Sequence, residues 1–299
     1  MSGNLIMVVG PTASGKSALA VSLAKHFSTC IISMDSRQFY RNMSIGTAVP
    51  TKEELSQAKH YFIQQRDIWE EYSAGQYERD ALCLLDELFK IHNVVIAVGG
   101  SGMYIRALEQ GMDDMPDVNP SLRRELRQIL LYEGLETLCQ KLLQLDPKYY
   151  MQVDRQNPQR VMRALEVCIQ SGKPYSKIRQ EQKRQRSFNI IKVGISYPRD
   201  VLYERINQRV DKMISSGLEA EARSLLPFRE NNALRTVGYS EMFRYFDGEI
   251  SFDEAVEQIK QNTRHYAKRQ MTWFRKDTDI SWFSPSSEFV VPYIESHLK

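Results

Sequence analysis

A run of eight residues near the start of the chain has the spacing of a loop that binds phosphate. It consists of Gly10, Pro11, Thr12, Ala13, Ser14, Gly15, Lys16 and Ser17. This run matches the pattern G-x-x-x-x-G-K-[ST], in which backbone N–H groups surround an anion. We predict that it binds a diphosphate or triphosphate, with Lys16 reaching the terminal phosphates and the Ser17 hydroxyl holding a magnesium ion.

Two further polar positions follow short apolar runs, where a parallel sheet would present them beside this loop. Asp35 stands in the segment Met-Asp-Ser-Arg-Gln and Ser101 in the segment Gly-Gly-Ser-Gly. In an open parallel sheet the ligand crevice lies beyond the carboxyl ends of the strands. Asp35 could therefore act as a base on an acceptor, although an aspartate there is also a common turn or cap residue. Ser101 could position an acceptor amine or a phosphate oxygen.

These residues leave the reaction open. An ATPase would place an acidic residue at a strand end to bind magnesium, whereas the apolar run at residues 94–98 is followed by glycine. That weakens the ATPase interpretation but leaves a small-molecule kinase possible on the same loop.

The apolar patterns around these residues predict an α/β protein. Residues 5–9, 30–34 and 94–98 are short apolar runs typical of buried parallel strands. Residues 16–27 and 74–91 have apolar positions at helical spacing. This alternation predicts a P-loop doubly wound parallel sheet.

The pattern changes after residue 112, and we predict two domains. Residues 113–120 carry two prolines and three aspartates, which suggests a linker. We expect residues 1–112 and 190–299 to form the P-loop α/β core and residues 113–189 to form an all-helical insertion domain. Further helices are expected at 122–131, 135–145, 158–171, 200–216, 218–226, 239–246 and 252–275, with a strand at 190–196.

Charge is distributed unevenly along the chain. The net charge is only +3, but residues 173–199 contain eight basic residues and one acidic residue, and residues 260–276 contain six basic residues and no acid. Such polarisation is typical of proteins that bind polyanions, although solvated helix faces would look similar. The four cysteines are widely spaced and predict reduced, mostly buried thiols. No apolar run is long enough to span a membrane, so we expect no membrane association and a cytoplasmic location.

Several motifs in order along the chain resemble the tRNA dimethylallyltransferase family, the isopentenyl transferases that modify an adenosine beside the anticodon. Besides the phosphate loop they include Asp35-Ser36-Arg37-Gln38, Ile45-Gly46-Thr47-Ala48, Asn157-Pro158-Gln159-Arg160 and Lys268-Arg269-Gln270. The resemblance covers nearly the whole chain. No cysteine follows residue 284, so the zinc finger of some eukaryotic members has no counterpart, which favours a bacterial-type enzyme.

The resemblance implies a specific reaction. The N6 amine of a tRNA adenosine at position 37 attacks C1 of dimethylallyl diphosphate and pyrophosphate leaves. Asp35 would orient the amine and take its proton, while Lys16 and Mg²⁺ at Ser17 would offset the charge on the leaving group. Arg209 matches a family arginine placed to engage tRNA or the diphosphate. Ser101 matches a position that usually holds threonine, so its hydroxyl is kept.

The resemblance also implies that the helical insertion domain, residues 113–189, contacts tRNA, and it identifies residues that would bind the anticodon stem-loop. They are Asp35, Ser36, Arg37, Gln38, Ser101, Arg123, Gln159, Arg160 and Arg163. An extracted base would need gripping and stacking groups, for which Gln38, Phe39 and Tyr40 are candidates, although core packing is the simpler role for Phe39. The two basic stretches would follow the tRNA backbone, and we expect a monomer.

Three rival functions remain at this point. An adenylate isopentenyltransferase would use the same donor on a free nucleotide, but it would have little use for the helical insertion. A small-molecule kinase would transfer phosphate from ATP. A nucleotide-regulated RNA-binding module would bind tRNA and leave it unmodified.

Overall fold

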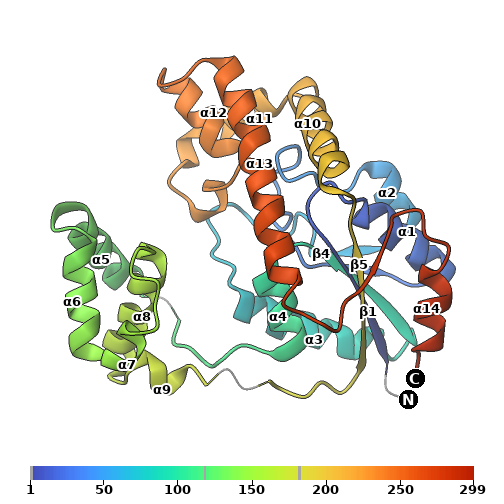
Figure 1. Ribbon diagram of the computed structural model, residues 1–299, viewed down its shortest axis with the longest axis horizontal. Helices are drawn as coiled ribbons and strands as arrows, with labels where there is room; N and C mark the ends of the chain where they lie inside the picture. Colours follow the sequence, from blue (N-terminus) through green and yellow to red (C-terminus); the bar gives the residue numbers. More distant parts are fainter. Residues whose placement is uncertain (1–2, 118, 181–182) are drawn as a thin grey trace. The chain divides into compact units, whose positions relative to one another are not determined.

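A parallel sheet of six strands organises the larger part of the protein (Figure 1). The computed structural model describes residues 3–117, 119–180 and 183–299. The strands are β1 (Asn4–Val9), β2 (Ile31–Ser33), β3 (His60–Tyr61), β4 (Val94–Gly99), β5 (Asn189–Ile195) and β6 (Ser281–Phe283). Their order is β3-β2-β4-β1-β5-β6 and every pairing is parallel. The predicted doubly wound parallel fold is confirmed.

The chain divides into two compact units, which we describe separately. The sheet unit comprises residues 1–110 and 185–299, and the helical unit comprises residues 111–184. The sheet unit therefore resumes before residue 190, where the strand pattern had placed the boundary.

Helices cover both faces of the sheet. The helices of the sheet unit are α1 (Lys16–His26), α2 (Lys52–Gln57), α3 (Ala74–Leu88), α4 (Gly102–Gln110), α10 (Arg199–Ser215), α11 (Leu218–Leu225), α12 (Tyr239–Phe246), α13 (Phe252–Phe274) and α14 (Val290–Ser296), with the 3-10 turns η1 (Leu226–Phe228) and η2 (Asn232–Leu234). α1 and α14 pack on one face, and α3 and α4 pack on the other. Because both faces are covered, all of β1 is buried, and its residues 5–9 form a continuous apolar run.

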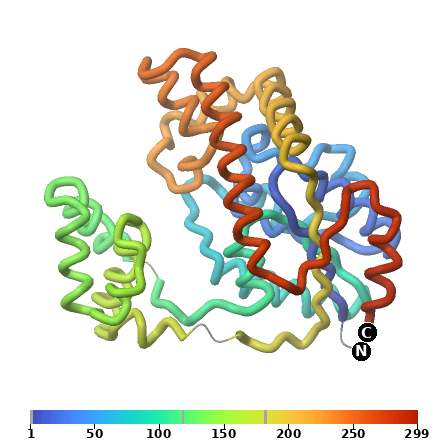
Figure 2. Tube along the Cα trace, viewed as in Figure 1, coloured from blue at the N-terminus to red at the C-terminus, as the bar shows by residue number. Residues whose placement is uncertain are grey.

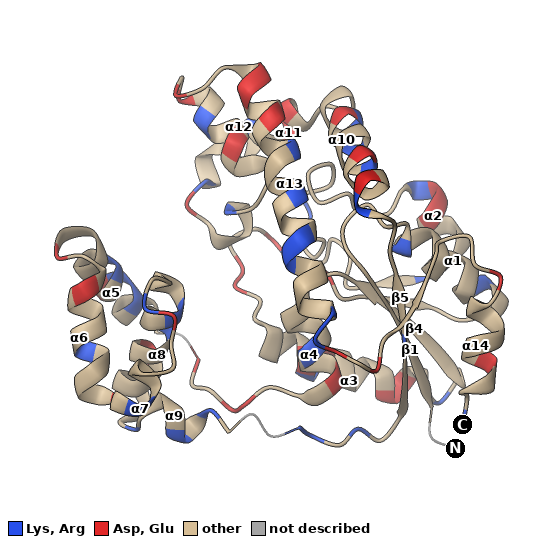
Figure 3. Ribbon diagram, viewed as in Figure 1, with Lys and Arg blue, Asp and Glu red and all other residues tan. Residues whose placement is uncertain are grey.

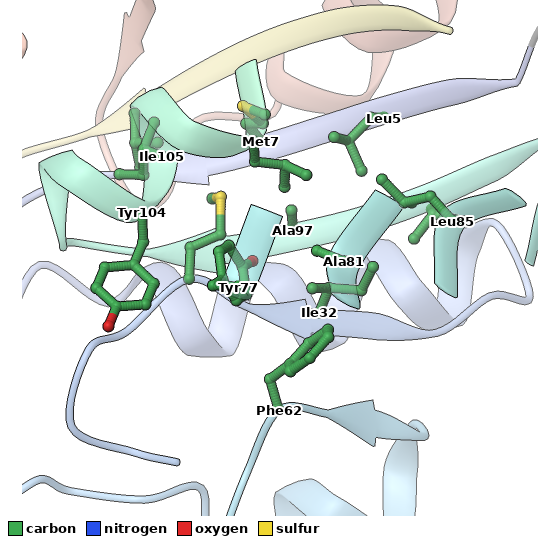
Figure 4. Packing of buried hydrophobic residues seen from close by; sticks show 14 of the residues in the cluster. Leu5, Met7, Ile32, Phe62, Tyr77, Ala81, Leu85, Ala97, Tyr104 and Ile105 are labelled. Atoms are coloured by element: carbon green, nitrogen blue, oxygen red, sulfur yellow. The ribbon is translucent and has the colours of Figure 1, made fainter. Parts of the chain in front are cut away.

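In the core on the α3 and α4 face, side chains of these helices pack against side chains of the strands (Figure 4). Tyr77, Ala81 and Leu85 lie one turn apart along α3 and pack with Leu5 and Met7 of β1. The helix begins at a capping box of Ser73 and Gln76, in which each side chain accepts a hydrogen bond from the backbone N–H of the other residue. Regular periodicity and a capped start explain why this helix was predicted from sequence.

A third apolar cluster joins the later helices of the sheet unit, and we call it the α10–α13 cluster. Figure 2 shows these segments gathered beside the sheet. Its buried residues are Tyr40, Met43, Ile68, Val210, Leu218, Ala222, Leu225, Ala233, Leu234, Tyr239, Met242, Phe243 and Ile259. The segment that follows β2 is therefore built into the same cluster as the helices near the end of the chain.

Two basic residues that were predicted to follow the tRNA backbone are instead buried in the sheet unit. The Arg186 guanidinium lies 2.9 Å from the Glu78 carboxylate. Lys192 Nζ lies 2.7 Å from a carboxylate oxygen of Glu109 and 2.7 Å from one of Asp277. Buried charges are retained when they are paired, so both residues serve the fold and the prediction is wrong for them.

The helical unit has its own small core. Its helices are α5 (Pro120–Tyr132), α6 (Leu135–Leu145), α7 (Pro147–Tyr150), α8 (Pro158–Ser171) and α9 (Tyr175–Ile178). Leu126, Leu138, Leu142 and Leu165 are buried in it. Arg123 of α5 makes two hydrogen bonds to the Glu166 carboxylate of α8, at 2.6 and 3.0 Å. Since Glu166 is 1% exposed, this pair ties the two helices together inside the unit.

We expect Arg123→Ala to destabilise the helical unit by about 3 kcal/mol, because it leaves the buried Glu166 carboxylate with a weaker partner, Arg163 at 3.5 Å. Hydrogen exchange of the α8 amides in the full-length protein measures this effect. Arg160→Ala is the matched control, since Arg160 is exposed. Unchanged α8 exchange in Arg123→Ala would show that the ion pair has no structural weight.

Short edge elements were missed from sequence. β3 has two residues and β6 has three, too few for an alternating pattern to be visible. α2, α4 and α14 were also missed. Of the four free cysteines, Cys83 is exposed and the others are buried. Among the residues that the structure describes, no helix is both long and apolar enough to cross a membrane.

Candidate active site

The phosphate loop joins β1 to α1 in the conformation of an anion-binding nest. Gly10, Ala13 and Gly15 have φ angles of 154°, 61° and 86°, which turn successive N–H groups inward. A Cβ on Gly10 would lie 2.4 Å from the carbonyl oxygen of Ile195, so the close approach to β5 requires glycine there. No side chain of the described residues caps the first turn of α1, which leaves its N–H groups to a ligand.

Distant segments hold this loop in place. Gln270 of α13 accepts a hydrogen bond from Thr12 N at 2.8 Å and donates one to the carbonyl oxygen of Gly100 at 2.9 Å. Arg205 of α10 donates to the Ala13 carbonyl oxygen at 3.0 Å. The Gln270 side chain therefore links the phosphate loop, 258 residues before it in the sequence, to the turn after β4.

Asp35 forms a turn and keeps one oxygen available. Its Oδ1 accepts hydrogen bonds from the backbone N–H groups of Arg37 and Gln38, at 2.9 and 3.4 Å. Within the described part of the chain Oδ2 has no hydrogen-bond partner. Asp35 borders the same cavity as Lys16. The turn role that the sequence left open is present, and the second oxygen can still accept from a ligand.

Ser101 lies just behind this cavity instead of lining it. Its Oγ accepts from Ser36 N at 3.0 Å and lies 3.2 Å from the Ser36 hydroxyl. Tyr266 of α13, by contrast, does border the cavity. Burial, and then the charge of Asp35, raise the pKa of Tyr266 to about 12, so the phenol stays protonated at neutral pH.

The cavity has a volume of about 490 Å³, which is the size of a small-molecule site. Its charged wall consists of Lys16, Arg37, Arg209, Arg235 and Arg269, with Asp35 and Glu241 as the acids. Its apolar wall consists of Ala48, Val98, Val210, Met213, Val237 and Ile259. All of these residues belong to the sheet unit. The basic excess favours an anionic ligand, and the apolar wall offers a place for a hydrocarbon part.

Two cations in the charged wall stand close enough to affect each other. Burial, followed by the charge of Arg209, lowers the pKa of Lys16 to about 8, and Asp35 opposes the shift. Burial also lowers the pKa of Arg209, against the attraction of Asp35 and Glu54. In the described residues Arg209 has no hydrogen-bond partner. An anion placed between Lys16 and Arg209 would relieve their repulsion.

Sequence reasoning missed residues that α13 and the preceding loop bring to the site. Ile259, Thr263, Tyr266 and Gln270 all border the cavity, and their spacing of four, three and four places them on one helix face. That stripe was a signal available in the sequence. Arg235 had no such signal. Figure 3 shows basic residues along α13, of which Arg269 borders the cavity.

The residues predicted to grip a base have other roles. Gln38 borders the cavity, but its Nε2 donates to the carbonyl oxygens of Thr47 and Ala48, at 3.3 and 3.0 Å. Phe39 is fully buried, as core packing predicts. Tyr40 is 5% exposed within the α10–α13 cluster. A stacking role for Tyr40 is therefore wrong.

The remaining predicted tRNA contacts lie in the helical unit. Gln159 and Arg160 are exposed in the first turn of α8, where Asn157 caps the helix. Arg163 donates to the carbonyl oxygen of Pro116 at 3.2 Å. With Arg123 it faces Glu166. The structure therefore leaves Gln159 and Arg160 as the side chains with most surface.

A metal ion in this cavity would share its coordination between protein oxygens and a ligand. The described residues contain no cluster of three His, Cys, Asp or Glu side chains. Ser17, exposed at the start of α1, and Asp35 both border the cavity. Magnesium is commonly bound by one or two protein oxygens together with substrate phosphates and water. The oxygens of Ser17 and Asp35 are consistent with such a site.

Comparisons with known proteins agree on one family. The IPP transferase profile matches residues 38–277. A tRNA dimethylallyltransferase of Christiangramia forsetii is 51% identical, covering 100% of this chain and 99% of its own. The crystal structure of a tRNA isopentenylpyrophosphate transferase from Bacillus halodurans has a TM-score of 0.70 and 36% identity, covering 98% and 94% of the two chains.

A eukaryotic dimethylallyltransferase described as acting on tRNA shares the fold, with a TM-score of 0.81 at 23% identity over 99% of this chain and 77% of its own. The phosphate nest, the strand-end carboxylate and these full-length similarities agree with one another. The chain belongs to the IPP transferase family.

Proposed function

We propose that this protein transfers the dimethylallyl group of dimethylallyl diphosphate to N6 of the adenosine beside the anticodon, position 37, of a tRNA. The observation that carries the proposal is a single cavity in which the phosphate loop, the Asp35 carboxylate and an apolar wall meet. A nest for phosphates, a base and a hydrocarbon surface are the three features that prenyl transfer to an amine requires.

The donor would lie with its diphosphate in the nest, between Lys16 and Arg209, and its isoprenoid chain against Val210, Met213 and Ile259. Negative charge grows on the pyrophosphate as the C1–O bond breaks. Fixed cations and N–H groups aimed at that charge stabilise the transition state without reorganising. The phosphate loop would thus stabilise the negative charge of the departing pyrophosphate.

The acceptor adenosine would present N6 to Asp35. The N6 lone pair forms the new bond to C1 as the C1–O bond breaks, and a proton leaves N6 for Asp35 Oδ2. An adenine amine is a weak nucleophile because its lone pair is delocalised into the ring, so removal of that proton assists the reaction. Pyrophosphate carries away the bonding electrons.

Magnesium is the cofactor that would suit this site, and the Ser17 hydroxyl would hold it together with the diphosphate of the donor. Bound there, it would supply further positive charge to the leaving group. Ser17 would orient the diphosphate through its hydroxyl even before the chemical step.

The helical unit would bind tRNA through Gln159 and Arg160, while Ser36, Arg37 and Arg269 would meet the nucleotide that enters the cavity. The target base must leave its stack to reach Asp35. Contacts to the phosphate backbone make affinity fall as salt rises.

The test is incubation with magnesium, unmodified tRNA and labelled dimethylallyl diphosphate, with AMP and ATP as competing acceptor and donor. The mass of the digested nucleosides reports the product. Label on adenosine in tRNA supports the proposal. Label on AMP alone would identify an adenylate isopentenyltransferase, and consumption of ATP without prenylation would identify a kinase.

The pKa of Lys16, about 8 in the free protein, predicts a pH limit on donor binding. Lysine is charged below its pKa, so kcat/KM for the donor should be level below pH 8 and should fall about tenfold per pH unit above it. A pH profile at saturating tRNA measures this. Lys16→Arg should remove the fall, because a guanidinium remains charged. A level wild-type profile to pH 10 would contradict the prediction.

A further inference from the structure

One carboxylate holds a loop that borders the cavity. Glu221 of α11 accepts hydrogen bonds from the backbone N–H groups of Ser44, Ile45 and Gly46, at 2.9, 2.8 and 3.0 Å. It also accepts one from the Tyr239 hydroxyl at 2.6 Å. Four donors from two segments therefore converge on a single side chain that the proposed reaction does not use.

The same loop is held from its other side. Gln38 Nε2 donates to the carbonyl oxygens of Thr47 and Ala48, and Gln38 Oε1 accepts from Ser33 Oγ at 3.2 Å. Residues 44–48 thus have their first N–H groups bound by a carboxylate and their last carbonyl groups bound by an amide. The loop cannot shift without breaking several of these bonds.

This loop and the apolar wall form one packed surface. Gly46, Thr47 and Ala48 border the cavity. A Cβ on Gly46 would lie 2.6 Å from the Tyr239 ring, so the backbone rests directly on that ring. Tyr239 is fully buried in the α10–α13 cluster, against which Met213 also packs. Glu221 therefore sits behind the wall where the hydrocarbon part of a ligand would lie.

We propose that Glu221 is a positioning residue that holds residues 44–48 as part of the wall that receives the isoprenoid chain of the donor. A charged acceptor suits this role because hydrogen bonds to a carboxylate are strong and directional. The inference rests on the proposed function for the identity of that chain. It predicts that Glu221 contributes to binding of the hydrocarbon part of the donor and does not contribute to binding of the diphosphate part.

The experiment compares binding of dimethylallyl diphosphate and of inorganic pyrophosphate to the full-length protein with magnesium, by calorimetry. We expect Glu221→Gln to weaken dimethylallyl diphosphate binding about tenfold, the scale of one lost hydrogen bond to a charged group. Pyrophosphate binding should stay within about twofold. Glu219→Gln is the matched control, because Glu219 lies on the same helix in an exposed pair with Arg223.

A second variant reaches the loop without touching the carboxylate. Gly46→Ala should reproduce the loss for dimethylallyl diphosphate, since its Cβ must displace the loop from Tyr239. Equal loss for both ligands in Glu221→Gln would indicate a general structural role and overturn the inference, as would no loss for either. If the wild-type protein binds the two ligands equally, the proposed donor itself fails. If it prefers dimethylallyl diphosphate and Glu221→Gln keeps that preference, only the positioning role fails.

Discussion

Asp35→Asn is expected to lower kcat for prenyl transfer by about 10³, within the range that removal of a general base produces. The carboxamide has nearly the same size, and its oxygen can still accept from the N–H groups of Arg37 and Gln38, which Asp35 Oδ1 does in the native turn. The fold of the loop should therefore survive, while the site loses the oxygen that takes the N6 proton.

Single-turnover rates with preformed donor and tRNA complexes separate this effect from binding. Asp35→Asn should bind tRNA and pyrophosphate nearly as well as the wild-type protein and should show the same unfolding temperature. If kcat falls less than about tenfold, Asp35 acts only as a turn residue and the proton has another acceptor.

Lys16→Met is expected to lower kcat/KM for the donor by about 10³, because a cation aimed at the developing charge of the leaving group is lost. The methionine side chain fills a similar volume. The pKa of Lys16 is lowered in the folded protein, mainly by burial and then by Arg209. The folded state therefore disfavours the charged lysine, and its removal should leave the unfolding temperature unchanged or higher.

In Lys16→Met the activity should therefore fall without any loss of stability, which distinguishes loss of function from misfolding. Lys25→Met provides the control, since Lys25 lies in the last turn of the same helix and is exposed. A lower unfolding temperature in Lys16→Met, with donor kinetics unchanged, would mean that Lys16 serves the loop through its bond to Pro11 O at 3.1 Å and not the ligand.

Repulsion between unpaired cations in the charged wall gives the free site a physical reason to bind a diphosphate. The pKa values of Lys16 and Arg209 are both lowered, chiefly by burial; the charge of Arg209 adds to the shift of Lys16, and Asp35 opposes the shift of both. A dianion would replace that repulsion with attraction. Sites whose groups are strained before binding are common where function requires them.

Sequence patterns were sufficient to predict the family, the phosphate loop and most of the long elements. These features depend on local physics: an apolar run before glycines, a capping box at Ser73, proline at the start of α8 and glycine after its end. α6 and α8 begin and end at the predicted residues because their periodicity and their end signals agree. The strand-end rule brought Asp35 to the phosphate loop.

Tertiary structure alone decided which polar groups pair and which reach the ligand. Glu166 forms an ion pair with Arg123, and Glu78 forms one with Arg186. Glu221 binds a loop more than a hundred residues away in the sequence. Charge counts along a sequence cannot reveal such pairs, because a side chain's partner depends on how distant segments pack. For the same reason, the hydrogen bond between Gln270 of α13 and the phosphate loop could not be predicted from sequence.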